Sequence, residues 1–217
     1  MFNVCTACGL SHVEPEFDGS SQLVCSSCGD RRPFKRLPLL LVGGPAGAGK
    51  SSVGASLLGV LTEAVVIESD LLWRKEFDTP EDGYNEYCRL WLRLAAHISQ
   101  SGRPVALFGA GFAVPHGTQT LPERRLFSEI HYLGLVCDDE VLTARLRARP
   151  SWRHTTDDLI NEHVRFNHWL KEHAATTEPP VTLIDTTSAA VTETAALVAS
   201  WIRERATQAT QSTPSIP

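Results

Sequence analysis

The sequence predicts an α/β protein, in which a three-layer α/β/α domain is built on a five-stranded parallel sheet and a small cysteine-rich appendage precedes it. Three observations carry this prediction. Short apolar segments alternate with longer segments of helical periodicity over residues 38–205, a pattern typical of consecutive β-α-β units. The first apolar segment runs into a glycine-rich turn, and two C-x-x-C pairs stand ahead of it.

The composition is that of a globular protein with enough apolar residues for a core. Of its 217 residues, 42% are hydrophobic, which suffices for one medium-sized domain and an appendage. The net charge is −5, and residues 1–37 hold four basic and four acidic residues, so the acidic excess lies in the rest of the chain. We therefore expect no broad nucleic-acid footprint, although a local arginine cluster could still bind phosphates. The apolar runs are too short to span a membrane and the first residues form no leader, so we expect a cytoplasmic protein.

The cysteines of the appendage form two pairs with sixteen residues between them: Cys5 and Cys8, then Cys25 and Cys28. This is zinc-ribbon spacing, because each pair can sit on a tight turn and four thiolates complete a closed, structural tetrahedral site. Zinc is favoured over two disulfides or free thiols, since disulfides are rare in intracellular proteins. We assign residues 1–33 to a zinc ribbon that needs the metal to fold, and residues 29–37 to a linker. Whether the ribbon contacts a partner or only packs on the main domain stays open.

Residues 39–42 form the first predicted strand, and the turn after it carries the most specific signal in the sequence. Gly44 and Gly49, followed by Lys50 and Ser51, match G-x-x-x-x-G-K-[ST], the phosphate-binding loop. In this motif the backbone N–H groups hold phosphates, the lysine reaches the β and γ oxygens, and the hydroxyl binds Mg²⁺. Residues 52–61 can form the helix whose N-terminus faces the anion. The predicted nucleotide contacts are Gly44, Pro45, Ala46, Gly47, Ala48, Gly49, Lys50, Ser51 and Ser52, with Ser51 also the magnesium ligand.

The second predicted strand, residues 64–70, ends in a carboxylate. Asp70 follows Lys50 by 20 residues. Because the carboxyl ends of parallel strands line the ligand crevice of an open α/β sheet, we expect Asp70 near the γ-phosphate. There it could orient and deprotonate an acceptor hydroxyl, or hold a magnesium-bound water. The alternative is a helix N-cap for the residues from Leu71 onward.

The phosphate loop and the segment Val-Ile-Glu-Ser-Asp-Leu-Leu-Trp at residues 66–73 together resemble small P-loop kinases of the adenylate-kinase-like group. This group includes gluconate and shikimate kinases, chloramphenicol phosphotransferase and bacterial nucleoside kinases. The resemblance covers about residues 38–205, whereas the zinc ribbon lies outside the usual kinase pattern. It implies that Asp70 contacts the acceptor hydroxyl and that the strand order is 2-3-1-4-5.

The next segments are predicted to form the acceptor side of the crevice. Residues 84–101 carry apolar side chains at helical spacing, and residues 104–109 form a third strand followed by a loop over residues 110–116. Phe112 in this loop could stack on an acceptor ring. No carboxylate of the Walker-B kind ends this strand, so magnesium chemistry would depend on Asp70 and Glu68. If the resemblance holds, four further residues lie toward the acceptor: Trp73, Arg74, Tyr84 and Arg89.

An arginine cluster follows the fourth strand. Residues 121–128 predict a short helix, residues 130–137 a strand, and residues 138–148 a helix with an acidic start. Four arginines then occur within nine residues: Arg145, Arg147, Arg149 and Arg153. In an acidic protein this clustering indicates a phosphate site, because guanidinium groups suit the charge of a transferring phosphoryl group. The kinases named above carry a similar arginine-bearing lid, and we take Arg145, Arg149 and Arg153 as candidate catalytic residues. The alternative is a solvated face paired with local acidic residues.

The last part of the chain completes the domain. Residues 156–173 form a helix whose histidines recur every five residues and so point to different faces, which excludes a shared metal site. Residues 181–187 form the fifth strand and its exit loop. In related kinases this loop borders the adenine, so Thr186 and Thr187 are candidates for base contact. Residues 191–205 form the final helix, and residues 206–217 are predicted to be a disordered tail.

The function predicted from these features is ATP-dependent phosphoryl transfer to a hydroxyl of a small molecule, with ATP, Mg²⁺ and Zn²⁺ as cofactors. A nucleoside is the first choice of acceptor, and sugar acids or an antibiotic stay open. Two other functions are possible: a polynucleotide 5′-hydroxyl kinase whose ribbon grips the nucleic acid, and a non-catalytic nucleotide-binding adaptor whose ribbon binds a protein. Residues 34–205 are assigned to the kinase domain. The oligomeric state and the preferred nucleoside triphosphate are not determined by the sequence.

Overall fold

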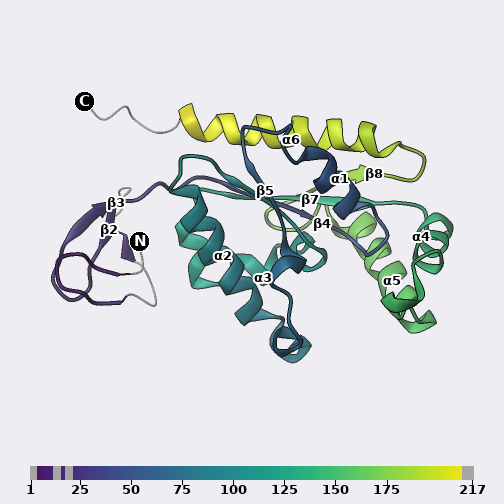
Figure 1. Cartoon of the computed structure of the whole chain (residues 1–217), viewed down its shortest axis with the longest axis horizontal. Coiled ribbons are helices and arrows are strands. Elements are labelled where there is room, and N and C mark those ends of the chain that lie inside the picture. The colour runs from purple at the N-terminus through teal and green to yellow at the C-terminus, as the bar shows by residue number, and fades with distance from the viewer. Residues whose placement is uncertain (1–3, 12–15, 18–21, 212–217) are drawn as a thin grey trace.

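A five-stranded parallel sheet lies at the centre of the computed structural model (Figure 1), which describes residues 4–11, 16–17 and 22–211. Its strands are β4 (Leu39–Gly43), β5 (Val65–Glu68), β6 (Val105–Phe108), β7 (Ile130–Val136) and β8 (Val181–Asp185). They lie in the order β5-β6-β4-β7-β8. In sequence numbering this is 2-3-1-4-5, so the predicted topology is confirmed. The central strand β4 is buried at every residue, as expected for a parallel sheet covered on both faces.

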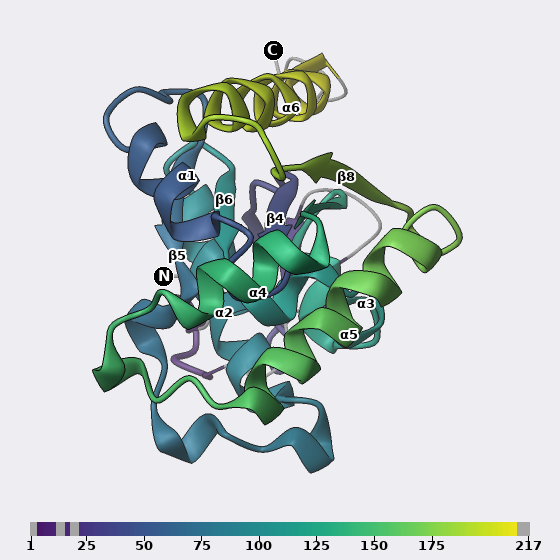
Figure 2. The same cartoon turned by 90° about the vertical axis from the view of Figure 1, so that its right-hand side faces the viewer.

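Helices cover both faces of the sheet, which gives the predicted three layers. The helices are α1 (Lys50–Leu57), α2 (Asn85–Ser99), α3 (His116–Gln119), α4 (Asp139–Arg147), α5 (Asp157–His173) and α6 (Val191–Gln211). Side chains of β4 alternate between the faces: Leu40 and Val42 pack with α1 and α6, whereas Leu39 and Leu41 pack with α2. In Figures 1 and 2, α4 and α5 lie side by side at the end of the molecule where the turn before α1 opens.

Several predicted boundaries are wrong, each for a local reason. Helix α1 ends at Leu57, not residue 61, because the chain turns to an extended conformation at Leu58. The segment predicted as helix 121–128 is a 3₁₀ helix, η5 (Pro122–Leu126). Helix α6 continues to Gln211, so residues 206–211 of the predicted disordered tail are helical; they contain neither glycine nor proline to stop the helix. The remaining tail, residues 212–217, lies outside the described residues.

The N-terminal appendage is a separate three-stranded antiparallel sheet. Its strands are β1 (Glu16–Phe17), β2 (Gln22–Val24) and β3 (Arg31–Pro33), in the order β1-β2-β3. Strand β3 falls inside the predicted linker of residues 29–37, so that prediction is wrong there: Leu23 pairs with Arg32 in the ladder. Phe34 is buried and belongs to the same apolar cluster as the α2 side of the main sheet. The appendage is therefore packed on the main sheet's core.

Hydrogen bonds fix the segment that joins the two sheets. The backbone N–H of Lys35 donates to the Gln100 side chain at 3.0 Å, and the Gln100 amide donates back to the Lys35 carbonyl at 3.1 Å. Arg36 donates to the Phe127 carbonyl at 3.1 Å. Figure 1 shows the appendage and the α4–α5 pair at opposite ends of the molecule's longest axis. The appendage is thus held away from the turn before α1.

Among the described residues, every helix is too short or too polar to cross a bilayer.

Candidate nucleotide and acceptor site

The turn between β4 and α1 has the backbone that the motif requires. Gly44 and Gly49 have φ angles of +130° and +98°, a region that other residues rarely adopt. A Cβ atom at Gly44 would lie 2.3 Å from the Leu135 carbonyl oxygen. Helix α1 begins at Lys50, so the N–H groups of its first turn point back at the loop. The phosphate loop, residues 44–51, is therefore a helix N-terminus open to an anion.

Lys50 lies over the loop with its ammonium group on main-chain carbonyls. Its Nζ donates to the carbonyl oxygens of Gly44 at 2.8 Å and Pro45 at 2.9 Å. Burial lowers the pKa of Lys50 to about 8, and the charges of Asp70 and Glu68 oppose this shift. Neutral carbonyls do not balance the charge of this buried ammonium group. A bound polyphosphate would therefore stabilise its charged form strongly.

Ser51 and Glu68 form a pair at the carboxyl end of β5. The Ser51 hydroxyl donates to a carboxylate oxygen of Glu68. A hydroxyl and a carboxylate are the oxygen ligands that Mg²⁺ takes in proteins. These two residues therefore fit a magnesium ion beside the phosphate loop, where the sequence placed Ser51 as a ligand and Glu68 as a contributor to magnesium chemistry.

Asp70 lies in the 3₁₀ helix η1 (Ser69–Leu72), just beyond β5. It is exposed, and its charge acts on both Lys50 and Arg149, raising the pKa of each against the effect of burial. The capping alternative is wrong, because Asp70 is inside the helix and no side chain caps its start. Asp70 thus lies close enough to Lys50 and Arg149 for its charge to act on both.

The turn that carries Asp70 is held from two sides. The Tyr87 hydroxyl of α2 donates to the Ser69 carbonyl at 2.5 Å. On the other side, a Cβ atom at Gly109 would lie 2.1 Å from the Ser69 hydroxyl oxygen, so only glycine lets the end of β6 approach so closely. No sequence motif indicates the Tyr87 contact, since Tyr87 belongs to the apolar stripe of its helix.

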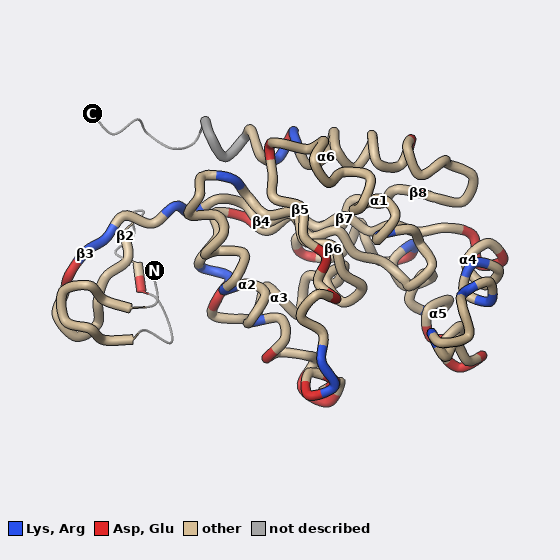
Figure 3. Tube along the Cα trace, viewed as in Figure 1, with Lys and Arg blue, Asp and Glu red and all other residues tan. Residues whose placement is uncertain are grey.

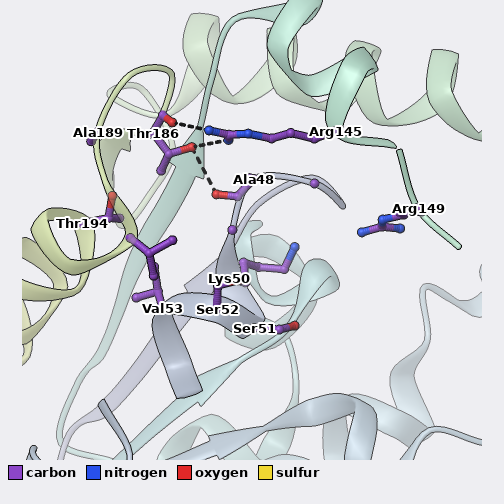
Figure 4. Close-up of a pocket in the computed structure, with 13 residues that line it drawn as sticks. Ala48, Lys50, Ser51, Ser52, Val53, Arg145, Arg149, Thr186, Ala189 and Thr194 are labelled. Atoms are coloured by element: carbon purple, nitrogen blue, oxygen red, sulfur yellow. Dashed lines mark hydrogen bonds between the residues drawn. The ribbon is translucent and has the colours of Figure 1, made fainter. Parts of the chain in front are cut away.

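The arginine cluster is divided between different surroundings. Figure 4 shows Arg145 directed at Thr186, whereas Arg149 lies on the side of Lys50 and Ser51. Arg145 donates to the Thr186 hydroxyl at 3.1 Å and to its carbonyl at 2.7 Å. Burial and the neighbouring Arg153 lower the pKa of Arg149. The four arginines separate because α4 ends at Arg147, so Arg149 does not follow Arg145 on a helical face.

The other two arginines lie further out. Arg153 is exposed and its guanidinium stacks over the Trp152 ring at 4.7 Å from the centroid. Arg147 is exposed and lies 3.5 Å from the Asp157 carboxylate. For Arg147 the alternative of a solvated face with acidic partners is therefore correct.

A cavity of about 340 Å³ lies beside the phosphate loop (Figure 4). It is lined by Gly47, Ala48, Gly49, Lys50, Ser51, Ser52, Val53, Arg145, Arg149, Thr186, Ala189, Val191 and Thr194. The buried Thr186 hydroxyl lies 3.1 Å from the Ala48 carbonyl oxygen, which joins the β8–α6 turn to the loop. The Thr187 hydroxyl instead accepts a bond from the Asp138 N–H at 2.9 Å, and Thr187 is outside the lining. The sequence missed Ala189, Val191 and Thr194, since small residues at a helix start carry no motif.

Aromatic rings cluster around Trp73, whose backbone N–H donates to the Asp70 carbonyl at 3.1 Å, on the predicted acceptor side. Trp73 packs edge-on against Tyr87 at 5.1 Å between centroids, and Tyr84 lies 6.2 Å from Trp73. Trp73 is 44% exposed and Tyr84 36% exposed, so both rings present a face to solvent. Phe112 is 1% exposed and belongs to the core, so the expectation that it stacks on an acceptor is wrong.

The two arginines predicted on this side, Arg89 and Arg74, differ in their surroundings. The Arg89 Nε lies 3.2 Å from both carboxylate oxygens of Glu123, and Glu123 is 1% exposed. Arg89 is therefore committed to neutralising a buried carboxylate. Arg74 is exposed.

The four cysteines of the appendage converge. The Sγ atoms of Cys5 and Cys28 are 3.7 Å apart, those of Cys8 and Cys25 are 3.6 Å apart, and all four lie within 4.8 Å of one another. A tetrahedral zinc ion with Zn–S bonds of about 2.3 Å separates its sulfur ligands by about 3.8 Å. The sulfur positions therefore fit zinc.

Comparison with known proteins supports the fold. No protein-family model matches the sequence, and no curated protein matches it either. Among solved structures, a gluconokinase from Sinorhizobium meliloti 1021 matches with a TM-score of 0.53 and 18% identity, over 82% of this chain and 99% of that chain. A sugar kinase from a Janibacter species matches with a TM-score of 0.53 and 16% identity, over 81% and 98%. The tunicamycin resistance protein of Deinococcus radiodurans matches with a TM-score of 0.52 and 18% identity, over 77% and 96%.

At these identities the likeness is one of fold. The predicted fold class, a three-layer P-loop kinase fold with a five-stranded parallel sheet, is confirmed.

Proposed function

We propose that the protein is an ATP-dependent phosphotransferase that moves the γ-phosphoryl group of ATP to a hydroxyl of a small molecule. The observation that carries this proposal is that Asp70, just beyond the end of β5, lies close enough to Lys50 of the phosphate loop and Arg149 after α4 for its charge to act on both. A phosphate grip and a carboxylate on the neighbouring strand end are the two parts that phosphoryl transfer to an alcohol needs. Two of the structural neighbours, the gluconokinase and the sugar kinase, are kinases by name.

The donor would occupy the cavity beside the phosphate loop. Lys50 and the loop amides would hold the β and γ phosphates, and Ser51 with Glu68 would hold Mg²⁺. When bound, the ion neutralises charge on the β and γ phosphates. The cavity continues from the loop to Arg145 and Thr186, so we place the base at that end. Arg145 would then contact the base or ribose, and not the transferring group.

The chemical step would depend on Asp70 and Arg149. The acceptor hydroxyl oxygen forms a bond to the γ phosphorus, the bond from that phosphorus to the β–γ bridging oxygen breaks, and the hydroxyl proton passes to the Asp70 carboxylate. Arg149, which is partly buried, would stabilise the negative charge on the transferring group. Arg153 would join it only if the lid moves, since its guanidinium now lies on Trp152.

A nucleoside is the acceptor that we propose first. The exposed faces of Trp73 and Tyr84 beside Asp70 could stack on a base. Sugar acids are less well supported as acceptors. The Arg89 guanidinium, which could bind their carboxylate, is already held by Glu123.

The polynucleotide kinase alternative receives less support from the arrangement. The appendage lies at the opposite end of the longest axis from α4 and α5, so it could not grip a strand at the phosphate loop of the same chain. Figure 3 shows acidic and basic residues interspersed over the main domain, with basic residues also gathered around α4 and between β3 and β4. Between β3 and β4, Arg36 is bonded to Phe127 and stacked on Phe17.

One assay tests the proposal. The protein is incubated with Mg-ATP and with nucleosides, sugars, sugar acids and oligonucleotides in turn, and phosphorylated products are detected by mass spectrometry. We expect transfer to a nucleoside. Transfer to oligonucleotide ends alone would support the polynucleotide kinase, and nucleotide binding without transfer to any acceptor would support the adaptor.

Arg145→Ala is expected to raise the KM for ATP about tenfold while kcat stays within about twofold. The variant would lose the hydrogen bond from Arg145 to the base or ribose, whereas the groups around the γ-phosphate would be unchanged. Initial rates over a range of ATP concentrations measure this. Arg147→Ala, on the same helix but exposed, is the matched control. A loss of kcat at unchanged KM would return Arg145 to the transition-state role predicted from the sequence.

We also propose that residues 1–33 form a zinc ribbon and that residues 34–205 form the phosphotransferase domain. All six cysteines are free, which suits a reducing compartment such as the cytoplasm.

The wild type is expected to hold about one zinc ion per chain. Cys25→Ser is expected to lose this ion, because the three remaining thiolates cannot complete the tetrahedral site. Residues 1–33 should then become sensitive to protease, since they need the metal to fold. Zinc content by mass spectrometry and the pattern of limited proteolysis measure this. Cys88→Ala, a buried thiol of α2, is the control and should keep the zinc. Binding of Mg-ATP should survive in both variants, since the ribbon is far from the loop; a wild type without zinc would contradict the assignment.

A further inference from the structure

One histidine of α5 contacts the phosphate loop directly. The Nδ1 atom of His163 accepts a hydrogen bond from the Ala46 N–H at 3.4 Å. Ile160 and Val164, on the same helix, belong with Ala46 and Leu142 to one apolar cluster. Helix α5 therefore rests on the loop at this point, and His163 is its polar contact with the loop.

The surroundings of His163 lower the pKa of its ring. Burial lowers the pKa of His163, the charges of Lys50 and Arg149 lower it further, and Glu162 raises it. A neutral ring can offer Nδ1 as an acceptor, as the bond from the Ala46 N–H requires. The tautomer in this state thus has its proton on Nε2.

This contact occupies one backbone N–H of the phosphate loop. Backbone N–H groups of a phosphate loop serve the bound phosphates, and the Ala46 N–H is already used by His163. Lys50 is likewise turned to the carbonyls of Gly44 and Pro45. A phosphate that takes up the Ala46 N–H and the Lys50 ammonium group would displace His163 and the two carbonyls from them.

Once released, the ring faces a group of the opposite kind. Phosphate oxygens only accept hydrogen bonds, so a ring nitrogen that turns to one must donate. A neutral ring can donate through one nitrogen only, whereas the imidazolium donates through both and forms a stronger, charge-assisted hydrogen bond to a phosphate. The negative charge of a triphosphate offsets the charges of Lys50 and Arg149, which removes the main electrostatic obstacle to protonation.

We propose that His163 recognises the terminal phosphate of a bound nucleoside triphosphate: the ring leaves the Ala46 N–H, takes up one proton from solvent, and donates a hydrogen bond to a γ-phosphate oxygen. The inference rests on the proposed function only in that the crevice must bind a nucleoside triphosphate. After transfer, the diphosphate has no γ-phosphate for the ring to bind. The ring then releases its proton to solvent and again accepts a hydrogen bond from the Ala46 N–H. His163 thereby distinguishes the donor from the spent donor.

Histidine titration by NMR tests the proton uptake. The ring signals of the protein are followed against pH in the free state, with Mg-ADP, and with the non-hydrolysable Mg-AMP-PNP; the signal of His163 is the one missing from His163→Asn. We expect its pKa below the ordinary value of about 6.5 in the free and ADP states, and above it with AMP-PNP. The ring signals of His173, on the same helix with its Nδ1 at 3.0 Å from the Trp169 carbonyl oxygen, are the control and should not respond to either nucleotide. An unshifted His163 with AMP-PNP would overturn the inference.

Nucleotide affinity separates recognition from a structural tie. In His163→Asn, the side-chain oxygen can still accept from the Ala46 N–H but cannot become a cation. We expect the affinity for Mg-AMP-PNP to fall at least about tenfold, the loss of one charge-assisted hydrogen bond, and the affinity for Mg-ADP to stay within about twofold. His173→Asn should change neither. Equal losses for both nucleotides would mean that His163 only holds the loop, and would overturn the proposal.

The outcomes also separate this inference from the proposed function. A wild type that binds AMP-PNP with a raised His163 pKa but phosphorylates no acceptor contradicts the proposed function alone. Phosphoryl transfer with an unshifted His163 contradicts the inference alone. A wild type that binds no nucleotide contradicts both.

Discussion

Replacement of Lys50 by alanine is expected to lower kcat/KM for Mg-ATP at least about a thousandfold. The ammonium group is the charge that reaches the β and γ phosphates in this motif, and loss of one such preorganised charge costs transition-state stabilisation of this order. Burial makes the loss larger, because the same group in a desolvated crevice interacts more strongly than in water. Steady-state kinetics with the acceptor found in the transfer assay measure this effect.

The fold is expected to survive the change. In the structure the Lys50 ammonium binds the Gly44 and Pro45 carbonyls, which water can reach when the side chain is removed, and no buried carboxylate loses its partner. The melting temperature should therefore stay close to that of the wild type. Lys171→Ala, an exposed lysine of α5 that lies 3.9 Å from the Asp138 carboxylate, is the control and should keep its activity. Wild-type turnover in Lys50→Ala would show that the phosphate loop does not serve catalysis.

Asp70→Asn is expected to lower kcat by about a hundredfold to ten-thousandfold while the affinity for Mg-AMP-PNP changes little. An amide keeps the shape of the side chain but cannot take the proton of the acceptor hydroxyl. The turn itself should be preserved, because it is held through Ser69 by the Tyr87 hydroxyl and by the close approach of Gly109. Calorimetry gives the affinity and product formation gives kcat.

A neighbouring carboxylate provides the comparison. Asp78, exposed on the same segment, should tolerate the change to asparagine without loss of turnover. Retained turnover in Asp70→Asn would remove Asp70 from the mechanism. A large loss of Mg-AMP-PNP affinity would indicate instead that Asp70 helps to hold the metal.

Predictions from the sequence succeeded where the signal is local. The strand and loop before Lys50 and a helix following the loop are found, because a glycine-rich turn needs particular φ angles at fixed spacing. The predicted end of that helix is wrong. The convergence of the four cysteines followed from two turns of equal spacing. The sheet order followed from the family resemblance and is confirmed.

Predictions failed where the structure of one segment depends on its contacts with another. The sequence predicts a linker where strand β3 forms, because Arg31–Pro33 is polar and becomes a strand only by pairing with Gln22–Val24. The spacing predicts one cluster of arginines, but helix α4 ends between Arg145 and Arg149, and Arg145 binds the Thr186 turn. The loop position of Phe112 predicts a pocket residue, whereas its side chain is buried in the core.

The sequence by itself determined the phosphate loop, the cysteine site and the alternation of strands and helices, since each depends on spacing within a few residues or on a regular period. Tertiary structure alone decided which side chains meet at the crevice. The contact of His163 with Ala46 spans 117 positions in the chain, and that of Arg145 with Thr186 spans 41. Such contacts depend on how helices pack on the sheet, and packing is a property of buried surfaces from many segments at once, which no single stretch of residues encodes.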